Sequence, residues 1–168
     1  FNLIKGSLRV ADLGAAPGSW SQMLSDKLFT KGNNNKSKIY AIDLQNIEPI
    51  EKVIIIKKDI KDFLKERYII DKNSLDLVLS DMAPKATGHR FTDQARAEDL
   101  VHAAADFSKY YLAKNGNFIC KLLGINNKNN LIKQMKKNYK SVKLFKPESS
   151  MKDSKEIYLI CLSFNNLH

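Results

Sequence analysis

Residues 10–24, VADLGAAPGSWSQML, change from an apolar strand pattern to a helical pattern across a glycine-rich turn. The strand ends at Asp12, the turn contains Gly14, Pro17 and Gly18, and helical spacing of apolar residues follows. A strand, a glycine turn and a helix in this order usually hold a nucleotide-like cofactor. This stretch therefore predicts an α/β domain with a cofactor site at its first turn.

The glycine spacing argues against two common phosphate-binding turns. A dinucleotide-binding turn reads G-x-G-x-x-G, but its later glycines would fall at Ala16 and Ser19 when counted from Gly14. The chain also has no Gly-Lys-Ser/Thr triplet of the kind found in phosphate-binding loops. A cofactor with a nucleoside and no phosphates fits this turn, and S-adenosylmethionine (SAM) is the obvious candidate.

The rest of the chain alternates between strand and helix patterns. The predicted strands are 8–13, 39–43, 52–59, 75–81, 116–123, 141–146 and 156–164, and the predicted helices are 19–29, 60–68, 92–112 and 129–139. The last two strands are joined by PESSMKDSK, which has no helix pattern and therefore suits an antiparallel pair. We predict an α/β, Rossmann-like fold: one domain over residues 1–168 with a doubly wound, mostly parallel seven-stranded sheet and an antiparallel last strand.

Charged residues stand where the predicted strands end. Acids close the first four strands, a lysine lies in the second half of the fifth, and an acid opens the antiparallel last strand: Asp12, Asp43, Asp59, Asp81, Lys121 and Glu156. Ligands in such sheets bind outside the carboxyl ends of the strands. An antiparallel strand begins at the edge where parallel strands end, so we expect Asp81, Lys121 and Glu156 to meet.

The composition indicates a polyanionic partner. The net charge is +10, and the segment 126–155 holds nine lysines against two acids. This concentration favours a surface for a phosphate backbone, although 24 of the 28 basic residues are lysine, so compositional bias is the alternative. No apolar run approaches the length that spans a bilayer, so no membrane partner is expected. Cys120 and Cys161 lie in apolar runs and are predicted to be buried reduced thiols, and no metal site is expected.

Four motifs give the pattern a specific likeness. They are DLGAAPGSWSQ (12–22), LSDMAP (79–84), CKLL (120–123) and PESSMKDSKEIYLI (147–160). In this order they resemble the FtsJ/RrmJ family of ribosomal RNA 2'-O-ribose methyltransferases, and TGHRFTDQARAEDLVHAAADF (87–107) is similar to its bacterial and mitochondrial members. The resemblance implies a class I SAM-dependent enzyme that methylates a ribose 2'-hydroxyl, with a uridine of large-subunit ribosomal RNA as the expected target.

The resemblance also implies roles for single residues. The family's catalytic set is Lys–Asp–Lys–Glu, and its last three members match Asp81, Lys121 and Glu156. Lys121 would take the proton of the 2'-hydroxyl, and the two carboxylates would orient the ammonium group. Asp43 would bind the ribose hydroxyls of SAM and Asp59 the adenine edge. The full predicted cofactor site is Gly14, Gly18, Trp20, Asp43, Asp59 and Asp81.

The first lysine of the catalytic set has no match. In the family it lies upstream of the first strand, whereas Lys5 stands too close to that strand and in another context. We expect an N-terminal extension carrying this lysine to be missing from the sequence.

Several alternatives stay open from the residues. One is a module that binds SAM and RNA with little turnover, and another is a 2'-O-methyltransferase acting on tRNA or another RNA. A small-molecule or protein methyltransferase shares the fold but not the acid–lysine–acid set, and it has no use for the lysine-rich segment. The expected partner is ribosomal RNA or the large ribosomal subunit, bound by a monomer through the lysine-rich surface. The expected location is the cytoplasm of a bacterium, or alternatively a mitochondrion or other organelle of a eukaryote.

Overall fold

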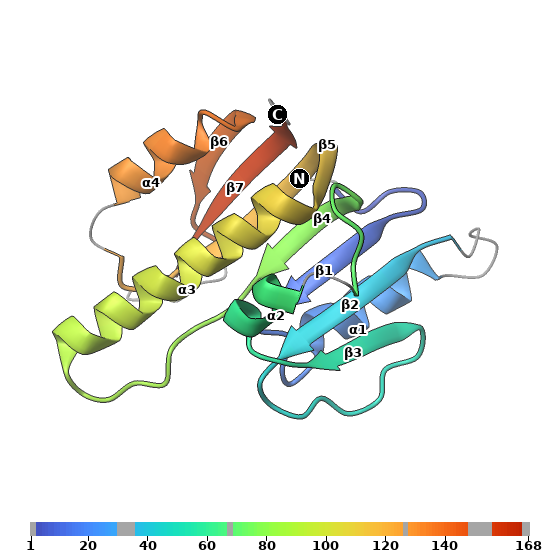
Figure 1. The fold of residues 1–168 in the computed structure, drawn as a ribbon, viewed down its shortest axis with the longest axis horizontal. Coiled ribbons are helices and arrows are strands. Elements are labelled where there is room, and N and C mark those ends of the chain that lie inside the picture. Colours follow the sequence, from blue (N-terminus) through green and yellow to red (C-terminus); the bar gives the residue numbers. More distant parts are fainter. Residues whose placement is uncertain (1–2, 30–35, 67–68, 126–127, 148–155, 166–168) are drawn as a thin grey trace.

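The computed structural model describes residues 3–29, 36–66, 69–125, 128–147 and 156–165, which form a seven-stranded sheet with helices on both faces (Figure 1). The strands are β1 (Arg9–Leu13), β2 (Lys38–Asp43), β3 (Val53–Lys57), β4 (Leu75–Ser80), β5 (Leu112–Leu122), β6 (Tyr139–Phe145) and β7 (Ile157–Phe164). The helices are α1 (Ser19–Leu28), α2 (Ile60–Glu66), α3 (Arg90–Tyr111) and α4 (Lys128–Met135).

The strand order is β3-β2-β1-β4-β5-β7-β6. Neighbours from β3 to β5 pair in parallel, whereas β7 lies between β5 and β6 and is antiparallel to both. The predicted doubly wound sheet with a reversed last strand is therefore confirmed. This order places the end of β5 and the beginning of β7 at the same edge.

Different helices cover the two faces of the sheet. On one face, Leu24 and Leu28 of α1 pack in a buried cluster with residues of β1 and β4. On the other, α2, α3 and α4 bury the larger cluster, in which Phe63 of α2 lies 5.6 Å from Phe107 and 5.9 Å from Tyr111 of α3, measured between ring centroids (Figure 1). Burial of these rings supplies much of the free energy that holds α3 on the sheet.

The fifth strand begins earlier than the sequence pattern indicated. We predicted a strand over 116–123 after a loop, but β5 starts directly after α3 and pairs Leu112 with Leu75. The next pair joins Asn117 to Leu77, so the register shifts in the intervening residues, and Asn115 adopts a positive φ of 67°. The polar composition of this insertion concealed the strand because its residues bulge out of the ladder.

The interior chemistry agrees with a reduced apolar core. Cys120 and Cys161 are buried and free, as predicted, and burial raises the pKa of the Cys120 thiol to about 12. Among the helices of the described ranges, none combines the length and the apolarity needed to cross a membrane.

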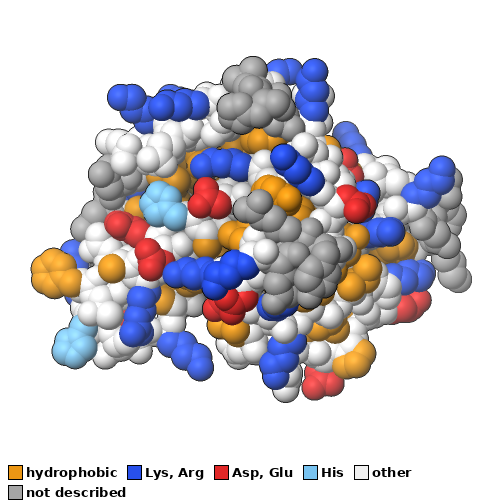
Figure 2. Space-filling model, viewed as in Figure 1, with side chains coloured by type: hydrophobic (Ala, Val, Ile, Leu, Met, Phe, Trp, Pro, Cys, Tyr) orange, Lys and Arg blue, Asp and Glu red, His pale blue; other side chains and the backbone are white. Residues whose placement is uncertain are grey.

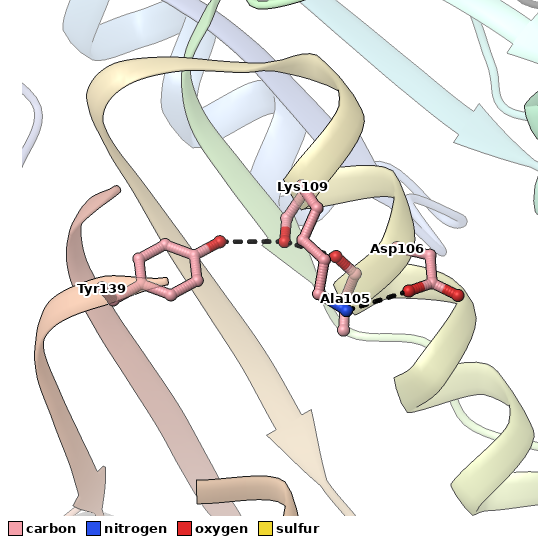
Figure 3. A network of polar contacts seen from close by, with 5 residues as sticks. Ala105, Asp106, Lys109 and Tyr139 are labelled. Atoms are coloured by element: carbon pink, nitrogen blue, oxygen red, sulfur yellow. Dashed lines mark hydrogen bonds and ion pairs between the residues drawn. The ribbon is translucent and has the colours of Figure 1, made fainter. Parts of the chain in front are cut away.

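A buried polar contact ties α3 to the edge strand β6. The hydroxyl of Ser108 donates to the carbonyl of Ala105 at 2.7 Å and lies 2.9 Å from the hydroxyl of Tyr139 (Figure 3). Burial raises the pKa of Tyr139. Since Ser108 has already used its proton on Ala105, Tyr139 is the donor to Ser108 in this arrangement.

This donor assignment predicts unequal costs for the two simple truncations. Tyr139→Phe removes one hydrogen bond and should lower the free energy of unfolding by about 1 kcal/mol. Ser108→Ala leaves a buried Tyr139 hydroxyl without its partner and should cost more, about 1–3 kcal/mol. Urea unfolding of both variants and the double variant measures this. A smaller cost for Ser108→Ala than for Tyr139→Phe would contradict the assignment.

Candidate functional site

The strand ends form one polar edge, as predicted. Asp81 directly follows β4, Lys121 is the penultimate residue of β5, and Glu156 directly precedes β7. The register pairs Ser80 with Cys120 across β4 and β5, and Lys121 with Tyr158 across β5 and β7. These pairings bring groups from distant parts of the sequence onto neighbouring strands.

Lys121 lies between two carboxylates. Its Nζ is 3.1 Å from Oδ1 of Asp81 and 3.0 Å from Oε1 of Glu156. The lysine side chain is 14% exposed, whereas Glu156 is 41% exposed, so the lysine is held in the wall and the glutamate at the rim. Two charge-assisted contacts fix the position of the ammonium group.

The electrostatics of this cluster keep Lys121 charged. Burial by itself lowers the pKa of Lys121, but the contacts with Glu156 and Asp81 outweigh burial, so the net pKa is raised above its ordinary value. The two carboxylates therefore hold Lys121 in a fixed orientation. For Lys121 to act as a base, another group must lower its pKa. A nearby second cation would lower this pKa.

The glycine turn is required by packing against the protein itself. Gly14 has a φ of 73°, and a Cβ there would lie 2.7 Å from Cγ and 2.9 Å from the backbone nitrogen of Met82. Gly18 has a φ of 119°, and a Cβ there would lie 2.9 Å from Cδ1 of Ile50. Both glycines thus let neighbouring segments close around the turn, and contact with a cofactor remains a prediction for them.

Asp12 is buried beneath this turn. It is 1% exposed, and its Oδ2 accepts a hydrogen bond of 2.7 Å from the Ser21 hydroxyl. Its Oδ1 is buried and has no hydrogen-bond partner in the part of the chain that the structure describes. Burial raises the pKa of Asp12 to about 6, the Ser21 hydrogen bond opposes this, and the charges of Asp81 and Asp43 add to it.

The next two acids also hold local structure. Asp43 accepts from the backbone N–H of Ala16 at 2.9 Å and of Gln45 at 2.7 Å, so it joins the first turn to the end of β2. Asp59 accepts from the N–H of Lys61 at 2.7 Å at the start of α2. Asp43 thus lies at the glycine turn, whereas Asp59 lies at the start of α2.

An aromatic contact links the first helix to the polar edge. The rings of Trp20 on α1 and Tyr158 on β7 lie 6.0 Å apart between centroids, and Tyr158 is the strand partner of Lys121. Burial raises the pKa of Tyr158. The sequence analysis did not identify Tyr158. Residues two apart on a strand lie on the same face of the sheet, so the spacing from Glu156 could have indicated that Tyr158 lies beside the same site.

The described residues contain no group of three His, Cys, Asp or Glu side chains arranged to hold a metal ion. The polar edge therefore consists of carboxylates, one lysine and aromatic rings beside a glycine turn. Such a set suits a cationic ligand next to a group that transfers or holds a proton.

Comparisons with known proteins agree on one family. The model of the family described as FtsJ-like methyltransferase matches residues 1–164. Proteins from Rickettsia bellii and Rickettsia felis, both named ribosomal RNA large subunit methyltransferase E, are 41% and 39% identical over 165 residues. Each match covers 97% of this chain and 73% of the relative.

Solved structures show the same fold. A Plasmodium falciparum protein described as a ribosomal RNA methyltransferase superposes with a TM-score of 0.81 at 29% identity, covering 96% of this chain and 88% of that chain. A Streptococcus mutans protein described as a methyltransferase, in complex with SAH, gives a TM-score of 0.61 at 12% identity, covering 96% of this chain and 92% of that chain.

The buried carboxylate of Asp12 predicts a pH-dependent cost. Its folded pKa of about 6 lies above the ordinary 3.8, so the unfolded state loses this proton first as pH rises. The penalty is absent below 3.8, grows between the two values, and reaches about 2–3 kcal/mol above 6. Asp12→Asn should therefore stabilise the ligand-free protein at pH 7.5.

Urea unfolding across pH checks this, with the gain from Asp12→Asn expected to vanish below pH 3.8. Ser21→Ala is the matched control, because loss of its hydrogen bond should deepen the penalty at neutral pH. A gain that is constant across pH would show that the ionisation of Asp12 is not its cause.

Proposed function

The chain belongs to the FtsJ-like methyltransferase family, and we propose that it transfers a methyl group from SAM to a ribose 2'-hydroxyl of a uridine in large-subunit ribosomal RNA. The names of the Rickettsia relatives support large-subunit ribosomal RNA as the substrate. The observation that carries the reaction type is Lys121 held between Asp81 and Glu156 beside the glycine turn.

The residues of the turn fit SAM. SAM carries a positive sulfonium and an ammonium group, and Asp12, Asp43 and Asp81 place three interacting carboxylates around the turn. The buried Oδ1 of Asp12 lacks a partner among the described residues, and a nearby cation would stabilise its ionised form. SAM is the cofactor of the family, and it supplies a methyl group on an electron-poor sulfur.

We assign the cofactor contacts by position around this turn. Asp43 would accept hydrogen bonds from the ribose hydroxyls, and Asp59 from the adenine amine, because carboxylates accept both. The turn itself, Trp20 and Asp81 would border the methionine part. These assignments rest on the motif and on the convergence of the strand ends.

In the proposed step, the 2'-hydroxyl loses its proton to Nζ of Lys121 while its oxygen forms a bond to the methyl carbon. SAM would supply the methyl carbon, and its sulfur would leave with the electron pair of the broken carbon–sulfur bond. Asp81 and Glu156 hold Nζ in place and would stabilise the ammonium that forms. Because the pKa of Lys121 is raised, the lysine must first lose its own proton.

We propose that the first lysine of the family's catalytic set provides the missing cation. Its charge near Nζ would lower the pKa of Lys121. No lysine in residues 1–168 matches the motif that carries it in the family.

The charged state of Lys121 favours a second candidate, a module that binds SAM and RNA without turnover. A lysine that stays protonated cannot accept a proton, although it can still bind a phosphate or a hydroxyl. Methyl transfer from labelled SAM to ribosomal RNA, with nuclease mapping of 2'-O-methyl positions, separates the two candidates.

The lysine-rich flank is the proposed RNA surface. From Lys128 to Pro147 the chain has seven lysines and no acid, and α4 turns its apolar Leu131 and Met135 into the core. Basic side chains gather around α4 in Figure 2. The eight residues of α4 give a helix about 12 Å long.

The bacterial relatives support a bacterial enzyme, and we propose the cytoplasm as its location. Action as a monomer stays a prediction.

Loss of the catalytic lysine should separate chemistry from binding. Lys121→Ala should lower the rate of methyl transfer about 100- to 10,000-fold, the usual contribution of a positioned acid or base. The dissociation constant of SAM should stay within about twofold. Radiolabel transfer and calorimetry measure the two quantities, and an intact transfer rate would refute the mechanism.

Glu156→Gln is the informative control for that variant. It keeps the shape of the side chain but removes a charge that raises the pKa of Lys121. The pH–rate profile should therefore move to lower pH, even as weaker orientation reduces the maximal rate. A profile that does not move would assign Glu156 a structural role.

The RNA surface predicts a charge-specific salt effect. Replacing Lys133, Lys136 and Lys137 by alanine should reduce the slope of log affinity against log salt by up to about two, since each phosphate contact contributes about 0.7–0.9. The matched control replaces Lys38, Lys52 and Lys114, which lie away from α4, and should leave the slope nearly unchanged. Equal slopes for both triple variants would show that the lysines around α4 reflect compositional bias and do not form an RNA surface.

A further inference from the structure

We propose that Phe91, at the start of α3, stacks on an unpaired base of the RNA substrate. The proposal rests on the proposed function, since it names a contact that would place RNA at the same catalytic edge. It concerns a residue outside the SAM turn and outside the Lys121 cluster.

Phe91 is exposed to an unusual degree. Its side chain is 88% exposed, against 61% for Leu44, the next most exposed large apolar residue in the described ranges. A phenylalanine in water forgoes the stabilisation that burial would give. Other apolar residues of α3, including Val101 and Phe107, are buried. The helix therefore packs on the core without Phe91.

The segment that presents Phe91 is held in a defined conformation. Oδ1 of Asp93 accepts from the backbone N–H of Thr87 at 2.8 Å and from its hydroxyl at 2.6 Å, and Oδ2 accepts from the N–H of Gly88 at 3.3 Å. Hydrogen bonds from Thr87 lower the pKa of Asp93. The ring is therefore displayed on an ordered helix start, which reduces the entropy lost when a base stacks on it.

Three cations lie close to the ring in the sequence. Lys85, Arg90 and Arg96 fall within six residues of Phe91, and the oxygens of the nearest acid, Asp93, are engaged by Thr87 and Gly88. The next acids along α3, Glu98 and Asp99, lie about two turns further on. An aromatic ring interleaved with cations is the pattern that binds single-stranded nucleic acid.

The position of the ring also suits the substrate. The segment 81–89 leaves β4 at Asp81, whose carboxylate holds Lys121, and leads to the beginning of α3. In Figure 1 that end of α3 projects beyond the sheet on the side toward which β4 points. A strand of RNA with its ribose at Lys121 can extend over this projection.

The test measures RNA affinity for four variants of the chain: Phe91→Ala, Phe91→Leu, Phe91→Trp and the control Ile54→Ala. The probes are a single-stranded oligouridylate, an RNA duplex of equal length, and large-subunit ribosomal RNA, the last both naked and in ribosomal particles. Phe91→Ala should weaken oligouridylate binding roughly 5- to 150-fold, the effect of one lost stacked base. Phe91→Leu should weaken it similarly, Phe91→Trp should retain it, and Ile54→Ala, which removes a 45% exposed apolar side chain from β3, should not matter.

The melting temperature and the SAM affinity should be unchanged in all Phe91 variants, which excludes misfolding as the cause. Unchanged oligouridylate affinity in Phe91→Ala would overturn the proposal, as would equal binding by Phe91→Leu and Phe91→Trp. An effect seen with ribosomal particles but not with naked RNA would assign Phe91 to a protein contact and also overturn it. Phe91-dependent RNA binding without methyl transfer would instead refute the proposed function and leave the stacking contact standing.

Discussion

The antiparallel insertion of β7 between β5 and β6 is the constraint on which the site depends. Parallel strands deliver their carboxyl ends to one edge, and β7 starts at that edge because it runs the other way. Glu156 therefore meets Lys121, although 34 positions separate them in the sequence and no local pattern joins them. The Ser108–Tyr139 contact also stabilises this arrangement, because it joins α3 to β6, the edge strand beside β7.

The same edge concentrates negative charge, which lowers the stability of the folded protein at neutral pH. Asp12 is buried with one oxygen lacking a partner among the described residues, and Asp43 and Asp81 raise its pKa further. A protein selected for stability alone would place an uncharged residue there. The cost becomes an advantage when a cation binds, because the repulsion among the carboxylates then favours the bound state.

The sequence predicted the parts of this site that follow from strand ends. Asp81, Lys121 and Glu156 were placed together from strand direction alone, and the structure confirms their contacts. The predicted start of β5 at residue 116 was wrong, because a polar bulge interrupts the apolar pattern. Burial of Asp12 and the ring contact of Trp20 with Tyr158 depend on how α1 packs, and a single sequence contains no distance between a helix and a distant strand.

The two proposed RNA contacts lie on opposite sides of Lys121 along the sheet. The Phe91 segment continues from β4, which precedes β5 in the strand order, whereas the lysine-rich flank belongs to α4 and β6, beyond β7. An RNA that touches both must cross the end of β5, where Lys121 lies. Two contacts that flank a reactive group restrict both the position and the direction of the strand, whereas the flanking charges alone would let it slide. If both proposed contacts form, stacking at one side and phosphate binding at the other would select one ribose among many, with Lys121 between them.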